Sequence, residues 1–181
     1  MALLDIIRKR KSVRSFIDKP VEREKISLCL EAARLAPSAC NAQPWRFVIV
    51  DDKELKDKLC NQAFSGMYSM CSFAKTAPVI VVVISEKQKF ITKVGAAVRG
   101  IQFYLIDIGI SCEHFVLQAT ELGLGSCWIG WFDEKKVKKT LNIPKGEKVD
   151  ALIALGYYQD LEPPPEKDRK SFDEIVSFNK Y

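Results

Sequence analysis

Two short segments of this 181-residue chain carry residues suited to binding an anion and a planar ligand. Residues 10–16 place the hydroxyl of Ser12 among several basic side chains. Residues 37–44 offer the hydroxyl of Ser38 and the amides of Asn41 and Gln43, and each of these groups can donate and accept hydrogen bonds. Prolines at both ends of the second segment fix φ, so we expect a stiff loop. Taken alone, this loop could equally be a plain connection between a helix and a strand.

The rest of the sequence offers few groups for acid–base or nucleophilic catalysis. It has no Ser-His-Asp set, no Gly-x-Ser-x-Gly elbow and no Walker loop. The single histidine, His114, lies in the middle of a predicted helix, where we expect a structural role. Because the six cysteines and this histidine show no ligand spacing, no metal site is predicted. If the chain is an enzyme, a cofactor should hold the reactive atom.

Length and composition are those of a soluble globular protein. With 48% hydrophobic and 28% charged residues, the chain fits a single domain over residues 1–181. The formal charge is +5, but basic and acidic residues are interspersed, which argues against a nucleic-acid partner. The longest apolar run, residues 77–84, is too short to span a bilayer, and the N-terminal residues do not form a signal peptide. We therefore expect no membrane partner and a cytoplasmic location.

Hydrophobic periodicity predicts the elements that must position the two segments. Helices are expected over residues 2–11, 22–36, 54–61, 107–122 and 134–141, and strands over residues 45–50, 78–85 and 149–157. Their irregular alternation favours a mixed sheet with helices packed around it. Gly123 and Asp133 are predicted to cap helices.

Three stretches are less regular. Residues 64–73 mix methionine and aromatic side chains and are interpreted as core, with one wall of a ligand pocket as the alternative. Residues 86–105 show no clear pattern. Residues 162–165 form a stiff spacer of prolines, after which the tail from Lys167 onward is expected to leave the domain.

Four segments, taken together and in order, resemble the nitroreductase family of FMN-dependent oxidoreductases. They are residues 10–16, 37–45, 121–130 and 167–176. The resemblance implies an α+β fold, a three-layer sandwich with a mixed central sheet surrounded by helices. It also implies a homodimer that exchanges its C-terminal arms, here residues 160–181, and that holds FMN at the subunit interface. The proline spacer fits such an arm, but it fits a tail that wraps its own subunit as well.

The same resemblance implies which residues hold the phosphate of FMN. These are Arg10, Lys11 and Ser12, joined by Lys167 and Arg169 from the tail. Such bases suit a group with nearly two negative charges at neutral pH, and each charge-assisted hydrogen bond contributes about 1.5–3 kcal/mol. Lys11 stands where many relatives have arginine, so its contact should be single rather than forked.

The flavin ring is assigned contacts by the same resemblance. Arg14 would lie against the pyrimidine edge, where it would stabilise the negative charge of the reduced ring and raise its reduction potential. The other contacts come from the partner subunit's loop and from a later segment: Pro37, Ser38, Ala39 and Asn41 with Gln43 in support, and Cys127, Trp128, Ile129 and Gly130. Gly130 would offer its backbone N–H, whereas Ile129 occupies a position that is acidic in some relatives. Trp131 is expected to pack in the core.

Our hypothesis is an enzyme that uses NADH or NADPH to reduce nitroaromatics, quinones or similar electron-poor acceptors by ping-pong hydride transfer. The flavin carries the chemistry, so no catalytic residue of the protein is predicted. Two alternatives share the fold, a reductive dehalogenase and a flavin-fragmenting enzyme. From other classes, the chain could be a non-catalytic FMN carrier or sensor, or a basic interaction domain. The acceptor and the choice between NADH and NADPH do not follow from the sequence.

Overall fold

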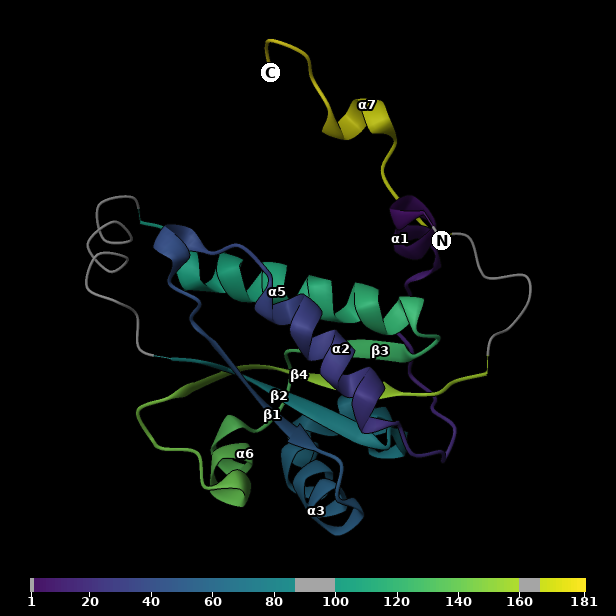
Figure 1. The fold of residues 1–181 in the computed structure, drawn as a ribbon. Helices are drawn as coiled ribbons and strands as arrows, with labels where there is room; N and C mark the ends of the chain where they lie inside the picture. The colour runs from purple at the N-terminus through teal and green to yellow at the C-terminus, as the bar shows by residue number, and fades with distance from the viewer. Residues whose placement is uncertain (1, 87–99, 160–166) are drawn as a thin grey trace.

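The computed structural model describes residues 2–86, 100–159 and 167–181 (Figure 1). Along the chain the elements are α1 (Leu3–Lys9), α2 (Arg23–Arg34), η1 (Ala39–Asn41), β1 (Trp45–Val50), α3 (Lys53–Ala63), η2 (Gly66–Thr76), β2 (Val79–Ser85), α5 (Phe103–Glu121), β3 (Gly125–Ile129), α6 (Glu134–Leu141), β4 (Lys148–Gly156) and α7 (Phe172–Ile175), where η denotes a 3-10 helix.

The centre of the fold is a four-stranded sheet in the order β1-β2-β4-β3. Every neighbouring pair is antiparallel. The predicted mixed sheet therefore needs correction: among the described residues, parallel pairing is confined to an isolated bridge between Ser12 and Ser126. This bridge places the basic segment near the N-terminus along the edge strand β3.

Helices cover both faces of the sheet and create two separate cores (Figure 1). All seven residues of β2 are buried. Its odd-numbered residues from Val79 to Val83 join the core shared with α2 and α5, and its even-numbered residues from Ile80 to Ile84 join the core shared with α3, η2 and α6. Successive side chains of a strand point to opposite faces, so one β-branched strand serves both cores. The expected three-layer α+β arrangement is confirmed.

Periodicity located most helices and strands to within a few residues. The exceptions are α5, which begins at Phe103 rather than at residue 107, and the elements that were not predicted, namely β3, η1, η2 and α7. The glycines around residue 124 were interpreted only as the end of a helix. Gly123 does end α5, with φ of 76°, and the Asp133 side chain caps α6 by accepting a hydrogen bond from the backbone N–H of Lys136 at 3.1 Å.

Two sequence-based core assignments need correction, the first only in part, because Phe64 is buried in the core and Cys71 and Phe73 pack against it. Met67 and Met70, within the segment interpreted as core, are 70% and 76% exposed. They belong to η2, where residues three apart share one face, and this face points to solvent. Trp131 is 47% exposed, and its indole N–H donates to the Met67 carbonyl oxygen at 3.0 Å. Its ring lies against that of Tyr68, with centroids 5.2 Å apart. These side chains form a surface of the molecule rather than part of its core.

The C-terminal tail projects away from the layered body (Figure 1). It contains the single-turn helix α7, which begins with a capping box between Ser171 and Glu174. Phe172, Ile175 and Phe178 are all exposed along this tail. The proline spacer predicted at residues 162–165 lies outside the described residues. A tail with exposed apolar side chains matches the expectation that it leaves the domain.

Candidate functional site

The basic segment near the N-terminus is held against the edge strand β3. The backbone N–H of Val13 donates to the Ser126 carbonyl oxygen at 2.9 Å. Val13 and Phe16 are buried in the same core, while Ser12 before them and Arg14 between them are exposed. The two buried side chains therefore anchor the segment to the fold and leave its polar residues at the surface.

A pair of glycines makes room for this segment. Gly125 of β3 and Gly156 of β4 are directly opposite each other in the sheet. A Cβ on Gly125 would lie 2.6 Å from a ring carbon of Tyr158 and 2.7 Å from a methyl carbon of Val13. A Cβ on Gly156 would lie 2.5 Å from the Cδ of Pro78. Real side chains do not approach so closely, so both positions require glycine for this packing.

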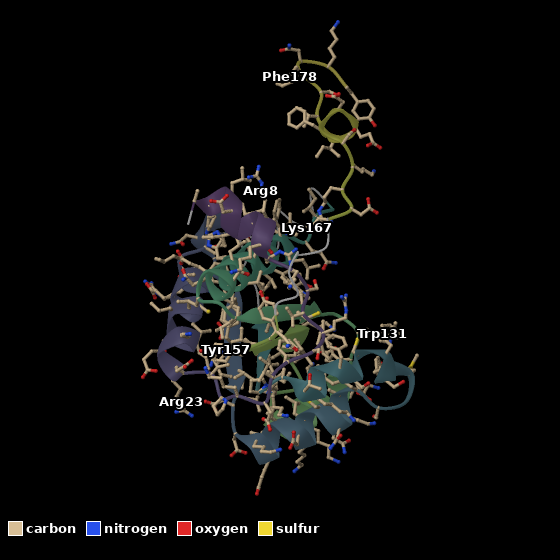
Figure 2. The ribbon with its side chains drawn as sticks, turned by 90° about the vertical axis from the view of Figure 1, so that its right-hand side faces the viewer. Arg8, Arg23, Trp131, Tyr157, Lys167 and Phe178 are labelled. Carbon is tan, nitrogen blue, oxygen red and sulfur yellow. The ribbon has the colours of Figure 1, made fainter. Side chains whose placement is uncertain are left out.

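Basic residues from the two ends of the chain converge beside α1 (Figure 2). The Lys167 ammonium donates to the Ile7 carbonyl oxygen near the end of α1 at 2.8 Å. Its pKa is lowered by partial burial, by Arg10 and by Arg169. Arg10 lies 3.8 Å from a carboxylate oxygen of Glu113 on α5. We call Arg10, Lys167 and Arg169 the basic cluster. An anion bound among them would relieve their mutual repulsion, so the cluster is suited to binding a phosphate group.

Two other predicted phosphate ligands flank this cluster. The Lys11 ammonium lies 4.8 Å from the ring centroid of Tyr158, a cation–π contact. Ser12 is exposed, next to its bridge with Ser126. The structure thus brings all five predicted phosphate residues to one end of the molecule.

Arg14 lies over a group of aromatic and thiol side chains. Its guanidinium is 5.9 Å from the ring centroid of Phe73 and also donates to the Ser12 carbonyl oxygen at 3.4 Å. Burial raises the pKa of the Cys127 thiol, and the positive charge of Arg14 offsets this only in part. The pKa of Cys71 is raised for the same reason, with the same opposing charge. Both thiols are therefore neutral at physiological pH, which does not suit them as nucleophiles.

The four predicted site residues at the end of β3 differ in what they expose. Trp128 is 41% exposed and Gly130 is exposed, whereas the side chains of Cys127 and Ile129 are buried. A contact from Ile129 to a ligand would therefore have to come from its backbone. A Cβ on Gly130 would have nothing within 4 Å, so its backbone faces open space.

The second predicted segment forms a tightly bonded loop, residues 37–43, which we call the amide loop. The Gln43 backbone N–H donates to the Ser38 hydroxyl oxygen at 2.9 Å, and the Gln43 side-chain amide donates to the Asn41 side-chain oxygen at 3.0 Å. Pro37, Asn41 and Gln43 are exposed, and Ala39 is half-buried. The Ala39 backbone N–H donates to Asp107 on α5 at 3.0 Å.

The amide loop and the basic cluster lie apart within one chain. Figure 1 shows η1 of the loop beside the start of α5 and α1 near the other end of that helix. The contacts with α5 agree with this separation, because the loop is hydrogen-bonded to Asp107 in the second turn of the helix and the cluster is paired with Glu113 further along it. The structure therefore unites the residues of segments 10–14, 127–130 and 167–169 but does not bring the amide loop to them.

Sequence reasoning missed the residues that hold these segments in place. Asp107, Glu113 and Tyr158 were not singled out. One feature of the sequence could have indicated Asp107: it is a lone carboxylate in an otherwise apolar stretch from Phe103 to Ile110. Its partner is a backbone N–H, which no pattern of residue types reveals.

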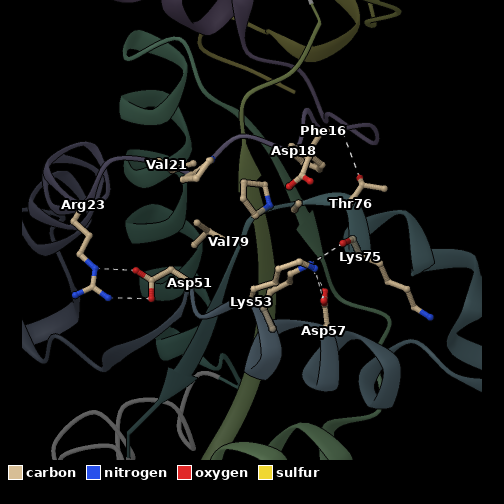
Figure 3. Close-up of a pocket in the computed structure, with 14 residues that line it drawn as sticks. Phe16, Asp18, Val21, Arg23, Asp51, Lys53, Asp57, Lys75, Thr76 and Val79 are labelled. Atoms are coloured by element: carbon tan, nitrogen blue, oxygen red, sulfur yellow. Dashed lines mark hydrogen bonds and ion pairs between the residues drawn. The ribbon is translucent and has the colours of Figure 1, made fainter.

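A separate cavity of about 560 Å³ lies between β2, α3 and the start of α2 (Figure 3). Most of its charged groups are paired: Arg23 donates to Asp51 at 2.9 Å, Lys53 donates to Asp57 at 2.8 Å, and Lys56 is paired with Asp57. The ammonium groups beside Asp57 lower the pKa of its carboxyl to about 2. None of the residues predicted to bind FMN lines this cavity. We assign no ligand to it.

The described residues contain neither a candidate metal site nor a membrane-spanning helix. Over residues 2–86, 100–159 and 167–181, no cluster of three or more His, Cys, Asp or Glu side chains could hold a metal ion. Within the same ranges, no helix combines the length and apolar character needed to cross a membrane.

Comparison with known proteins gives consistent relatives over nearly the whole chain. The family model described as "Nitroreductase family" matches residues 7–70 and 67–157. A crystal structure of a nitroreductase family protein from Clostridium novyi NT has a TM-score of 0.77 and 33% identity, covering 88% of this chain and 87% of that one. An FMN-dependent nitroreductase from Clostridium difficile R20291 has a TM-score of 0.77 and 32% identity, covering 98% and 99%. An iodotyrosine deiodinase of Thermotoga neapolitana is 28% identical over 199 residues, covering 99% of this chain and 98% of its own.

Proposed function

Because this chain belongs to the nitroreductase family, we propose that it is an FMN-dependent oxidoreductase that uses NADH or NADPH to reduce small electron-poor acceptors. The observation that carries the proposal is the convergence of Arg10, Lys167 and Arg169 from opposite ends of the chain. Among the described residues, one carboxylate, that of Glu113, forms an ion pair with these three cations, so the cluster is unfavourable in the absence of an anion. The phosphate of FMN supplies that anion.

Each basic residue would have a distinct part in holding the phosphate. Arg10 can form paired hydrogen bonds through its planar guanidinium, whereas Lys167 supplies a compact charge at the end of α1. Lys11 lies over Tyr158, which orients its ammonium toward the same end. The exposed hydroxyl of Ser12 would add a neutral donor. Several such bonds retain a phosphate-bearing cofactor without a covalent link.

When bound, FMN supplies reversible hydride transfer between the nicotinamide and the acceptor. The chain itself positions and tunes the ring. The guanidinium of Arg14, exposed above Phe73, would stabilise negative charge on the reduced ring. The exposed backbone of Gly130 would offer its N–H to the ring, and the neutral thiol of Cys127 would pack beneath it.

A homodimer would complete the site. The amide loop lies apart from the basic cluster in one chain, so its polar groups reach a ring held by that cluster only if a second subunit supplies them. The exposed apolar residues of the tail, Phe172, Ile175 and Phe178, would be covered in the same assembly by exchange of the arm from residue 160 onward.

The surface formed by Met67, Tyr68, Met70 and Trp131 would contact the acceptor. Its first three residues lie on η2, which also carries Phe73 beneath Arg14, and Trp131 comes from the segment after β3. Exposed methionine and aromatic side chains adapt to flat apolar molecules of varied outline. This composition fits quinones and nitroaromatics, the acceptor classes that we propose. It is also the pocket wall that the sequence allowed as an alternative to a buried core.

The test is the visible spectrum of the purified protein, followed by anaerobic titration with NADH and with NADPH. We expect a yellow protein with the visible absorbance of oxidised flavin. One of the two nucleotides should abolish this absorbance by reducing the flavin, and a quinone or a nitrofuran should restore it. A yellow protein that neither nucleotide reduces would indicate an FMN carrier or sensor. A colourless protein that does not take up added FMN would contradict the proposal.

A second candidate function is reductive dehalogenation. The observation that favours it is the near full-length similarity to an iodotyrosine deiodinase of Thermotoga neapolitana. Release of iodide from iodotyrosine by the chemically reduced protein would support it. Rapid turnover of quinones with no iodide release would favour the first candidate.

A further inference from the structure

The amide loop adopts a backbone conformation that its residues do not favour. Cys40, Asn41 and Gln43 have φ values of 52°, 50° and 48°, in the left-handed region that L-residues other than glycine rarely occupy. Three such residues within four positions raise the free energy of the folded state, and a loop of this kind persists only when surrounding contacts hold it in place. Contacts from outside the loop must therefore help to hold it.

Bonds within the loop account for only part of this restraint. Gln43 is bonded to Ser38 and to Asn41, and both partners belong to the same loop. Such bonds stabilise the shape of the loop but do not fix its place on the fold. In the described ranges, one hydrogen bond joins residues 38–43 to another element, and it runs from the Ala39 backbone N–H to the Asp107 carboxylate at 3.0 Å.

Asp107 is placed to act as a fixed anchor. It is only 4% exposed, and a buried carboxylate is unfavourable unless it accepts hydrogen bonds. It lies in the second turn of α5, which is itself fastened to α2 by the Ser111 hydroxyl donating to the Ala33 carbonyl oxygen at 2.9 Å. A buried carboxyl group on a braced helix thus accepts one backbone N–H of a strained loop.

We propose that Asp107 is a positioning residue that sets the orientation of the amide loop, and thereby of Ser38 and Asn41 toward the flavin of the partner subunit. The tether itself follows from this chain alone. The part that concerns flavin binding rests on the proposed function.

The experiment compares Asp107→Ala with Asp107→Asn, using Glu121→Ala as the control. Asn keeps an oxygen that can accept the Ala39 N–H, and Glu121 is an exposed carboxylate at the far end of the same helix. Hydrogen–deuterium exchange of peptides covering residues 38–43 in the FMN-free protein measures the tether. The dissociation constant of FMN, from quenching of its fluorescence, measures the effect on the site.

For Asp107→Ala we expect exchange of the loop amides to speed up about tenfold and FMN affinity to fall by about tenfold or more, as the loss of a hydrogen bond to a charged group predicts. Asp107→Asn should recover most of both effects, and Glu121→Ala should change neither. If Asp107→Ala does not fold, Asp107→Leu, which fills a similar volume without an acceptor, takes its place: faster exchange in the loop supports the tether, and wild-type exchange overturns it.

The outcomes separate this inference from the proposed function. Unchanged loop exchange in Asp107→Ala overturns the tether, whatever the protein binds. A loosened loop with unchanged FMN affinity overturns the part played by Asp107 at the flavin site, while a yellow, active protein leaves the proposed function intact. A wild-type protein that binds no FMN, with a loop that still loosens in Asp107→Ala, overturns the proposed function and supports the tether.

Discussion

The basic cluster and the amide loop are the two polar regions that the proposed site needs, and different forces hold them. The cluster gathers three cations, and among the described residues one ion pair, 3.8 Å between Arg10 and Glu113, offsets them, so charge dominates it. The loop carries no charged side chain, and left-handed backbone and short hydrogen bonds dominate it. The cluster should therefore respond to salt, pH and charge substitution, and the loop to changes of backbone geometry.

The two regions also differ in when they reach their working arrangement. Hydrogen bonds within the loop and to α5 hold it in its conformation. In the cluster, partial burial and the charges of Arg10 and Arg169 lower the pKa of Lys167. Under the proposed function, folding alone prepares the loop, whereas a bound anion would relieve the repulsion within the cluster. The following four predictions test this contrast, beginning with the largest expected effect.

Removing both tail cations should weaken FMN binding most. In the double variant Lys167→Ala, Arg169→Ala, two charge-assisted bonds are lost, each corresponding to about tenfold or more in affinity. We expect the dissociation constant of FMN to rise by about 100-fold or more, as measured by fluorescence quenching. The matched double variant Lys170→Ala, Lys180→Ala removes two exposed cations of the same tail and should bind FMN normally. Equal losses in the two double variants would mean that net charge, not the cluster, attracts the cofactor.

Substituting the glycine pair should disturb the cluster without changing any charge. In Gly156→Ala the new methyl group meets the rigid ring of Pro78, and in Gly125→Ala it meets Tyr158 and Val13. We expect a loss of about 1–3 kcal/mol in the free energy of unfolding from overpacking, visible as a fall of about 2–4 °C in Tm per kcal/mol. Gly109→Ala, where a Cβ has nothing within 4 Å, is the control and should not destabilise the fold. Wild-type stability in both variants would contradict the packing described here.

Arg14→Ala should lower the reduction potential of the bound flavin and weaken its binding. Loss of a guanidinium beside the reduced ring should shift the two-electron potential by about 30 mV for each tenfold change in relative affinity. Anaerobic titration against a reference dye measures this shift. Arg14→Lys keeps a positive charge without the planar guanidinium, so its reduction potential should lie between those of the wild type and Arg14→Ala. An unchanged potential in Arg14→Ala would remove Arg14 from the site.

The smallest expected effect is a fall in FMN affinity at alkaline pH. Because the pKa of Lys167 lies below its ordinary value in the free protein, Lys167 begins to lose its proton before the unfolded chain would. Over that alkaline window the stability of the FMN-free protein should rise with pH, while its affinity for the phosphate should fall. We would measure FMN affinity from pH 7 to pH 10. The fall in affinity should disappear in Lys167→Met and persist in Asn41→Ala, which alters the loop alone. A fall that survives in Lys167→Met would belong to another group.

Much of the fold was accessible to sequence reasoning because its elements carry clear local patterns. The β-branched run of β2 and the capped helix α6 are examples. β3 escaped because it is a five-residue strand that starts at a glycine and depends on β4, a partner remote in sequence. Trp131 and Met67 were misplaced because large apolar residues suit a core and a ligand-facing surface equally well.

The candidate site was less accessible, because its parts come from distant positions. Resemblance to a family, not local pattern, linked Arg10 to Lys167 and Arg169. Nothing in the residue types indicates that Asp107 holds a backbone N–H of the amide loop. The need for glycine at residue 156 becomes visible only when the ring of Pro78 is found against it.

The position of Ser12 and Val13 along β3 has a consequence for solubility. β3 is the last strand of the sheet in this chain, and an uncovered edge offers unpaired N–H and C=O groups to other chains. The N-terminal segment occupies part of that edge through the hydrogen bond of Val13 to Ser126, and the charged Arg14 comes next in the sequence. The stretch proposed to retain a cofactor thereby also shields the molecule from edge-to-edge aggregation, so trimming the N-terminus should produce precipitation as well as loss of colour.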